Sequence, residues 1–158
     1  MESGYLIRDE EIYKAGANIF YIGDTDKNNP SRSFISFDIS GLSGITVTSA
    51  EFSANSYKTW GDASGLFPVG IFIADWGSVS IYTCEFNQEG LLVGECSTQN
   101  IICSSEALKN ELIDKIGSGS QRFQIMIYFT GAETNGNNEW DGYSYGVPSA
   151  NLNINYTH

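Results

Sequence analysis

Residues Ser31 to Ala54 read SRSFISFDISGLSGITVTSAEFSA, and apolar and polar side chains alternate on both sides of the central GLSG. The alternation gathers apolar side chains on one face of each half: Ile35, Phe37 and Ile39 in the first, Ala50, Phe52 and Ala54 in the second. A period of two is typical of strands that bury one face and expose the other. We therefore expect two strands, Ser33–Ile39 and Ala50–Tyr57, joined as a hairpin by a short Gly/Ser turn.

The rest of the chain shows the same kind of short alternating segment. Further strands are expected at Tyr5–Ile7, Ala17–Ile22, Val69–Ala74, Val79–Cys84, Leu91–Cys96, Arg122–Thr130 and Ala150–Tyr156. One segment instead has a helical period, since Leu108, Leu112 and Ile116 recur every four residues between Ser104 or Ser105 as a cap and Gly117 as the end. Many short strands and one helix predict an all-β fold, a jelly-roll-type antiparallel β-sandwich with one short helix. We expect residues 1–158 to form a single domain.

The charge excludes several classes of partner. Asp and Glu number 19 against 8 Lys and Arg, so the formal net charge is -11. Such a surface repels phosphate backbones and anionic lipid, and we expect neither nucleic acid nor lipid headgroups as partners. The sequence has no apolar run of about 18 residues, so we also expect no membrane insertion. An acidic surface does suit an extracellular protein and can hold hard cations such as Ca²⁺.

Catalytic motifs are scarce. The single histidine, His158, is the last residue, which argues against a Ser-His-Asp or Cys-His site and against a His-rich zinc site. Carboxylate chemistry remains, because Glu133, Glu139 and Asp141 share one segment with Trp140. We expect a non-catalytic protein, with a carboxylate-dependent glycosidase or lyase as the less favoured alternative.

The cysteines leave two interpretations open. Cys84 and Cys96 lie symmetrically about an expected turn at Asn87–Gly90, so they could form a disulfide across a hairpin or remain two buried thiols. Cys103 is expected to be a small core residue.

A calcium site is suggested by Asp24, Asp26 and Asn28, which follow the D-x-D-x-N opening of a calcium-binding loop. An EF-hand would need Gly at the sixth position and Glu at the twelfth, where this chain has Asn29 and Ile35. A simpler Ca²⁺ site built on Asp24 and Asp26 is the functional hypothesis. The alternative is a pair of Asx turns in a solvated loop.

Two long segments, Lys58–Pro68 and Gly131–Pro148, have the composition of a sugar-binding site. Pyranose rings are bound by aromatic faces flanked by amides and carboxylates. The candidate ligand-binding residues are Trp60, Asp62, Trp140, Asp141, Tyr143 and Tyr145. The alternative is that these rings close the ends of the sandwich.

A second candidate surface is the outer face of two expected strands. Aromatic and polar side chains mix there: Arg32, Phe34 and Ser36 on one strand, and Gln124, Met126 and Tyr128 on the other. The alternative is that a loop or the helix covers this face. For the two charged residues near the turn we expect structural roles, Asp38 capping the turn and Arg32 pairing with a carboxylate.

The chain resembles the DNRLRE-type domain of surface and secreted proteins and the related carbohydrate-binding modules and disaggregatase-related surface-protein repeats. The matching residues are Arg32, Ser33, Phe37, Asp38, Ser40, Leu42 and Gly44, then Ser49, Ala50 and Phe52, then Asp75 and Trp76, and near the end Pro148 and Leu152. A Tyr at position 82 replaces a common Trp, and the usual Arg-Glu pair before Pro148 is missing.

The resemblance implies a jelly-roll module that binds polysaccharide without catalysing a reaction or that builds surface proteins, and some relatives are thought to bind Ca²⁺. We therefore expect an extracellular or cell-surface module that binds polysaccharide or cell-surface glycan. We expect it to be part of a larger protein, with neighbouring domains and with its signal or anchor outside this sequence. The alternative is a structural or adhesive domain with protein partners.

Overall fold

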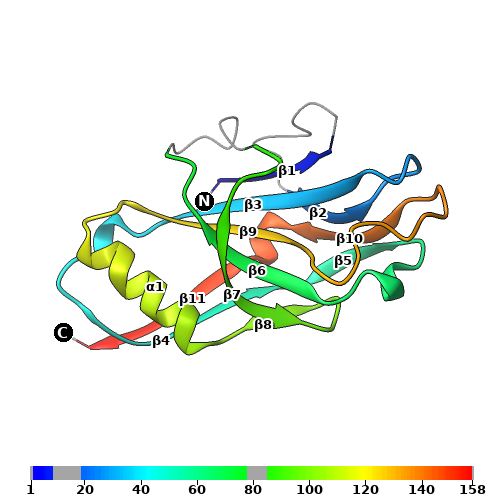
Figure 1. The fold of residues 1–158 in the computed structure, drawn as a ribbon. Coiled ribbons are helices and arrows are strands. Elements are labelled where there is room, and N and C mark those ends of the chain that lie inside the picture. Colours follow the sequence, from blue (N-terminus) through cyan, green and yellow to red (C-terminus); the bar gives the residue numbers. More distant parts are fainter. Residues whose placement is uncertain (1, 9–18, 78–84, 158) are drawn as a thin grey trace.

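The alternating segments pair into two antiparallel sheets, packed face to face in the computed structural model (Figure 1). The structure describes residues 2–8, 19–77 and 85–157. The larger sheet has the strands β1 (Glu2–Ile7), β2 (Ile19–Asp24), β3 (Pro30–Asp38), β5 (Ser56–Trp60), β6 (Val69–Ala74), β7 (Gly90–Cys96), β9 (Arg122–Phe129) and β10 (Asp141–Gly146). The smaller sheet has β4 (Thr46–Ala54), β8 (Ile101–Cys103) and β11 (Asn151–Thr157). The predicted all-β sandwich with one short helix is confirmed.

The order of the strands places distant parts of the chain side by side. The larger sheet runs β5-β10-β2-β3-β9-β6-β7, with β1 also pairing with β3, and the smaller sheet runs β11-β4-β8. No helix among the described residues is long and apolar enough to cross a bilayer.

The expected hairpin at Ser31–Ala54 is wrong, because its two strands lie in different sheets. β3 pairs with β1, β2 and β9, whereas β4 pairs with β8 and β11. A short 3-10 turn at Ser40–Leu42 carries the chain from one sheet to the other, after the buried Ile39. Alternation shows which face of a strand is apolar but leaves its partner strand open, and here both apolar faces cover one shared core.

Asp38 caps this crossover, as predicted. Its Oδ1 atom accepts hydrogen bonds from the Ser40 backbone N–H at 3.0 Å and from the Ser40 hydroxyl at 2.7 Å. These donors hold the pKa of Asp38 below its usual range, and Arg122, at 3.9 Å, adds to the effect. The bonds favour the ionised carboxylate.

The space between the sheets is filled by side chains from both. Ile35 and Phe123 of the larger sheet and Phe52 of the smaller one are fully buried. The helix α1 (Glu106–Gly117) closes one end, with Leu108 and Leu112 turned into the core. Ser105 caps it by accepting a hydrogen bond from the Leu108 N–H at 3.0 Å. The helical period and its cap are therefore confirmed.

The outer face of the larger sheet is covered, so the second candidate binding surface is wrong. Phe34 and Met126 keep only 1% of their surface exposed, and they pack with Leu6 of β1 and with Trp76. Arg32 lies over the rings of Phe86 and Tyr128, with its guanidinium carbon 4.5 and 4.2 Å from the ring centroids. It also lies 3.7 Å from the Glu133 carboxylate, so the expected pairing of Arg32 is confirmed. A second apolar layer therefore covers the face of the sheet that the alternation predicted to be exposed to solvent.

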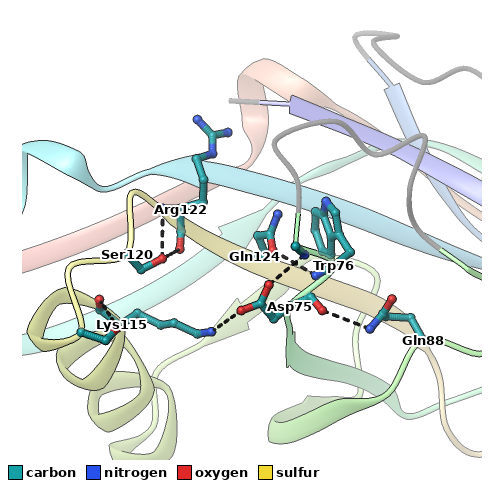
Figure 2. Close-up of polar contacts among 9 residues, drawn as sticks. Asp75, Trp76, Gln88, Lys115, Ser120, Arg122 and Gln124 are labelled. Atoms are coloured by element: carbon teal, nitrogen blue, oxygen red, sulfur yellow. Dashed lines mark hydrogen bonds and ion pairs between the residues drawn. The ribbon is translucent and has the colours of Figure 1, made fainter.

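Asp75 follows β6 directly and holds Trp76, a member of this layer, in place (Figure 2). Its carboxylate accepts bonds from Lys115 Nζ at 3.0 Å and from the Gly77 N–H at 2.9 Å, and Gln88 donates to its carbonyl at 3.2 Å. The Lys115 bond contributes most to lowering the pKa of Asp75. These contacts hold the neighbouring Trp76 against Gln124, whose Oε1 accepts from the Trp76 N–H at 3.3 Å.

Of the two cysteines predicted to face each other, only Cys96 lies within the described residues. β7 pairs with β6, with Cys96 opposite Val69, and Cys96 and Cys103 carry free thiols. Cys84 and the expected strand Val79–Cys84 lie outside the described residues.

Replacing Asp38 by Ala is expected to lower the melting temperature at pH 7 by a few degrees. Because the pKa of Asp38 is depressed in the folded state, its stabilisation is complete above the ordinary pKa of about 4 and is lost as the pH falls through the folded-state value. Thermal denaturation of both proteins from pH 7 to 3 should therefore show the difference shrink below about pH 4. The exposed Asp26→Ala is the control, and a difference that persists at pH 3 would contradict the capping role.

Replacing Phe34 by Ala is expected to lower the free energy of unfolding by about 3–5 kcal/mol, because it empties a packed site on the outer face. Urea denaturation measures the change. Tyr57→Ala removes a ring that is 58% exposed and is expected to change the free energy by no more than about 0.5 kcal/mol. Equal effects of the two variants would show that the outer face is not a packed layer.

Candidate functional site

The two long segments singled out in the sequence meet at the end of the sandwich opposite α1 (Figure 1). β10 inserts between β5 and β2, so that Asp141 lies opposite Asp24 and Gly142 lies opposite Trp60. We call this region the loop end. It comprises residues 24–29, 58–62 and 131–141.

Two buried carboxylates lie at its centre, Asp24 with none of its surface exposed and Asp141 with 1%. Asp141 Oδ2 accepts from the side-chain amides of Asn135 at 2.8 Å and Asn137 at 2.7 Å, and its Oδ1 accepts from the Asp62 N–H. Asp24 Oδ2 accepts from the Asn135 N–H at 3.0 Å. Asn135 thus bridges the two carboxylates.

The other oxygen of Asp24 is exceptional. Asp24 Oδ1 is buried and has no hydrogen-bond partner among the residues that the structure describes. Burial is the largest cause that raises the pKa of Asp24 above its usual value, and the nearby charge of Asp141 adds to it, against the opposing backbone N–H groups of Asn135, Asp141 and Asp24 itself. Burying a carboxylate oxygen without a hydrogen-bond partner costs free energy, so we expect Asp24 Oδ1 to bind a ligand.

Close backbone packing fixes the position of the carboxylates. Gly23 and Gly142 have φ angles of +149° and +155°, and a Cβ at Gly23 would come within 2.0 Å of the Asp141 carbonyl oxygen. The Tyr21 hydroxyl lies 2.7 Å from the Asp24 carbonyl oxygen and 2.9 Å from that of Asp141. Burial raises the pKa of Tyr21, so it stays a neutral donor. β2 and β10 are therefore locked together beside the carboxylates.

Trp60 and Trp140 lie side by side next to this centre. Their ring centroids are 6.4 Å apart at an interplanar angle of 46°, and both rings are half-buried. Trp140 meets the ring of Tyr21 edge to face at 5.6 Å, and Trp60 Nε1 donates to Ser144 Oγ at 2.8 Å. Lys58 Nζ lies 3.2 Å from the centroid of Trp60. The two indoles are thus held in place while part of their surface reaches solvent.

Asparagines join the loops around the rings. Asn28 Nδ2 donates to Asn138 Oδ1 at 2.7 Å, and the Asn138 N–H donates back to Asn28 Oδ1 at 3.1 Å. Both residues have positive φ angles, which asparagine tolerates better than most residues. Residues 24–29 and 131–141 are therefore one connected surface.

The remaining predicted ligand residues have different positions. Asp62 is exposed and caps a 3-10 turn by accepting from the Ser64 N–H at 2.9 Å. Tyr143 and Tyr145 belong to β10 and are buried, with Tyr145 stacked on Phe20 at 4.8 Å. Asp141 is also buried. Tyr143 and Tyr145 pack into the core and Asp141 is enclosed by amide groups, so sugar contact by these three residues stays a prediction that the exposed positions of the loop end serve better.

The two predicted metal ligands, Asp24 and Asp26, lie in different surroundings. Asp26 is exposed, whereas Asp24 is buried opposite Asp141, so the carboxylate facing Asp24 comes from a segment more than a hundred residues away. The sequence predicts Asp24 as a metal ligand and Asp141 as a sugar-binding residue, and so places them in separate sites. The alternating tyrosines at 143 and 145 were the one local signal that could have identified β10 and hence this pairing.

The three carboxylates of the glycosidase alternative lie in unlike surroundings. Glu133 pairs with Arg8 and lies 3.7 Å from Arg32, Glu139 is exposed, and Asp141 is buried among amides. A catalytic carboxylate pair needs both groups facing one bound sugar. The arrangement of the loop end does not favour that alternative.

A separate cleft of about 240 Å³ lies beside α1, between Lys115, Arg122 and Gln124. Its cations are engaged by the protein, since Lys115 binds Asp75 and Arg122 donates to the hydroxyl and carbonyl of Ser36 at 2.9 and 2.7 Å (Figure 2 shows Lys115 and Arg122). We assign this cleft a structural role.

Comparisons with known proteins leave the resemblance to DNRLRE-type domains as a prediction. No family model matches the sequence, and no curated protein matches it.

Proposed function

We propose that this protein is a non-catalytic extracellular module that binds polysaccharide or cell-surface glycan through Trp60 and Trp140. The observation that carries the proposal is the adjacency of two half-buried indoles at one end of the sandwich, with ring centroids 6.4 Å apart. Indole faces pack on the C–H surface of a pyranose ring, and a pair of them can contact neighbouring sugars.

The polar groups that a glycan needs surround the rings. Asn135, Asn137 and Asn138 are exposed, and so is Asp62. Amides and carboxylates bind sugar hydroxyls as donors and acceptors. The bonds that already connect the loops fix many of these groups in advance, which lowers the entropic cost of binding.

The position of Lys58 bears on which glycans could bind. Its ammonium group lies over the Trp60 ring, so a sugar that uses this face has to displace it. A lysine displaced in this way would remain beside the ligand. Neutral and acidic polysaccharides are therefore both candidates, and the net charge of -11 disfavours densely anionic chains.

A second candidate function, an adhesive module with protein partners, is favoured by β7. Its Leu91 and Leu92 are 54% and 44% exposed, and β7 ends the larger sheet among the described strands. Apolar side chains on an edge strand are suited to pairing with another protein.

Replacing Trp140 by Ala is expected to weaken retention on a bound polysaccharide at least tenfold, which corresponds to about 1.4 kcal/mol. Affinity electrophoresis in gels containing neutral or acidic polysaccharides measures the effect. Trp140→Phe keeps a ring and should retain part of the binding. Trp60→Ala is expected to act in the same direction.

The matched control is Tyr57→Ala, which removes a more exposed ring from the same strand as Trp60. It should leave retention unchanged. Wild-type protein that is not retained by any polysaccharide would contradict the proposal. Loss of self-association or partner binding on Leu92→Ser would then favour the adhesive module.

A further inference from the structure

We propose that Asp24 and Asp141 form a Ca²⁺ site at the loop end. This site does not depend on glycan binding, and it differs from the pair Asp24 and Asp26 that the sequence suggested. The carboxylates come from the end of β2 and the start of β10, which are paired strands of the larger sheet.

The first argument is charge. Asp24 and Asp141 are both buried, and neither forms an ion pair within the described part of the chain. The donors around them, from Asn135, Asn137 and Asp62, are neutral amides. Two buried negative charges without a cation are costly, and a divalent ion would compensate both.

The second argument is the unpartnered oxygen. Asp24 Oδ1 is buried without a hydrogen-bond partner among the described residues, although Asp24 Oδ2 is bonded. Because Asn135 donates from its backbone to Asp24 and from its side chain to Asp141, the two carboxylates lie on either side of one residue. Asp24 Oδ1 and Asp141 would be the first two ligands.

The chemistry of the donors favours calcium. The ligands that Asp24 and Asp141 offer are carboxylate oxygens, which suit hard cations, whereas zinc prefers imidazole and thiolate. Ca²⁺ tolerates irregular geometry and completes its six to eight ligands with carbonyls and water, whereas Mg²⁺ demands a near-ideal octahedron. Among the described residues, no group of three or more acidic, His or Cys side chains lies close enough together to hold a metal ion. A site with two carboxylates therefore predicts affinity in the range of about 10⁻⁴–10⁻³ M found in extracellular modules.

Thermal denaturation with Ca²⁺ alone tests the site. About 10 mM CaCl₂ is expected to raise the melting temperature of the wild type by roughly 3–10 °C relative to EGTA. Terbium(III) is a suitable spectroscopic probe, because Trp140 contacts Tyr21, whose hydroxyl touches the carbonyls of both ligand residues. Excitation of tryptophan should produce terbium luminescence that Ca²⁺ displaces.

Two matched variants locate the ion. Asp24→Asn removes one buried charge, so it should be at least as stable as the wild type in EGTA and should lose the Ca²⁺-dependent shift. Asp26→Asn, two residues away and exposed, should keep the full shift. If Asp24→Asn does not fold, the terbium titration of the wild type and of Asp26→Asn decides the question.

Three results would overturn the proposal. These are a wild type without a Ca²⁺-dependent shift or displaceable terbium luminescence, an equal shift with MgCl₂, and loss of the shift in Asp26→Asn. Retention on polysaccharide in EGTA, measured separately, shows whether glycan binding stands or fails independently of the ion.

Discussion

The larger sheet is buried on both faces, and the rest of the structure follows from that constraint. β3 turns Ile35 toward the smaller sheet and Phe34 toward the outside, yet both side chains are fully covered. The outer cover includes Leu6 of β1 and Trp76, and the neighbouring Asp75 binds Lys115 of α1. A sheet with two apolar faces needs a layer on each side, and at the loop end Trp60 and Trp140 remain half-buried beside the covered strands.

Local patterns predicted the elements in which apolar side chains recur at a regular strand or helix period. β3, β4, β9 and α1 each carry a regular apolar period, and all four contain the segment that the period indicates. The expected strand Ala50–Tyr57 is nevertheless divided between β4 and β5, which lie in different sheets. The partners of β3 and β4 could not be predicted, because alternation is the same in a hairpin and in a crossover between sheets. β10 was missed because Gly, Ser and Asp have low strand propensity, and its position between two strands depends on Gly142, whose backbone approaches β2 more closely than a side chain would permit.

The sequence predicted several residues of the candidate site but not which of them lie next to one another. Trp60 and Trp140 came from separate segments and do lie together, as a shared binding surface requires. The sequence pattern predicts Asp24 and Asp26 as a pair of metal ligands because they are close in sequence. The structure instead places Asp141 of β10 opposite Asp24. A pattern of spacing can identify residues that suit a cation, but burial and a missing hydrogen-bond partner become visible only when the strands are paired.

The contact between Tyr21 and Asp141 joins residues that are 120 positions apart. Closing so long a loop costs entropy, so contacts of this kind are slow to form during folding. The loop end is therefore assembled only in a chain whose first and last thirds have already met. Any ligand held there binds the native state and not its precursors. Its binding energy is added to the stability of the β2–β10 pairing, which joins the most distant segments among the described strands. Occupancy of the loop end would thus report whether the whole chain has folded.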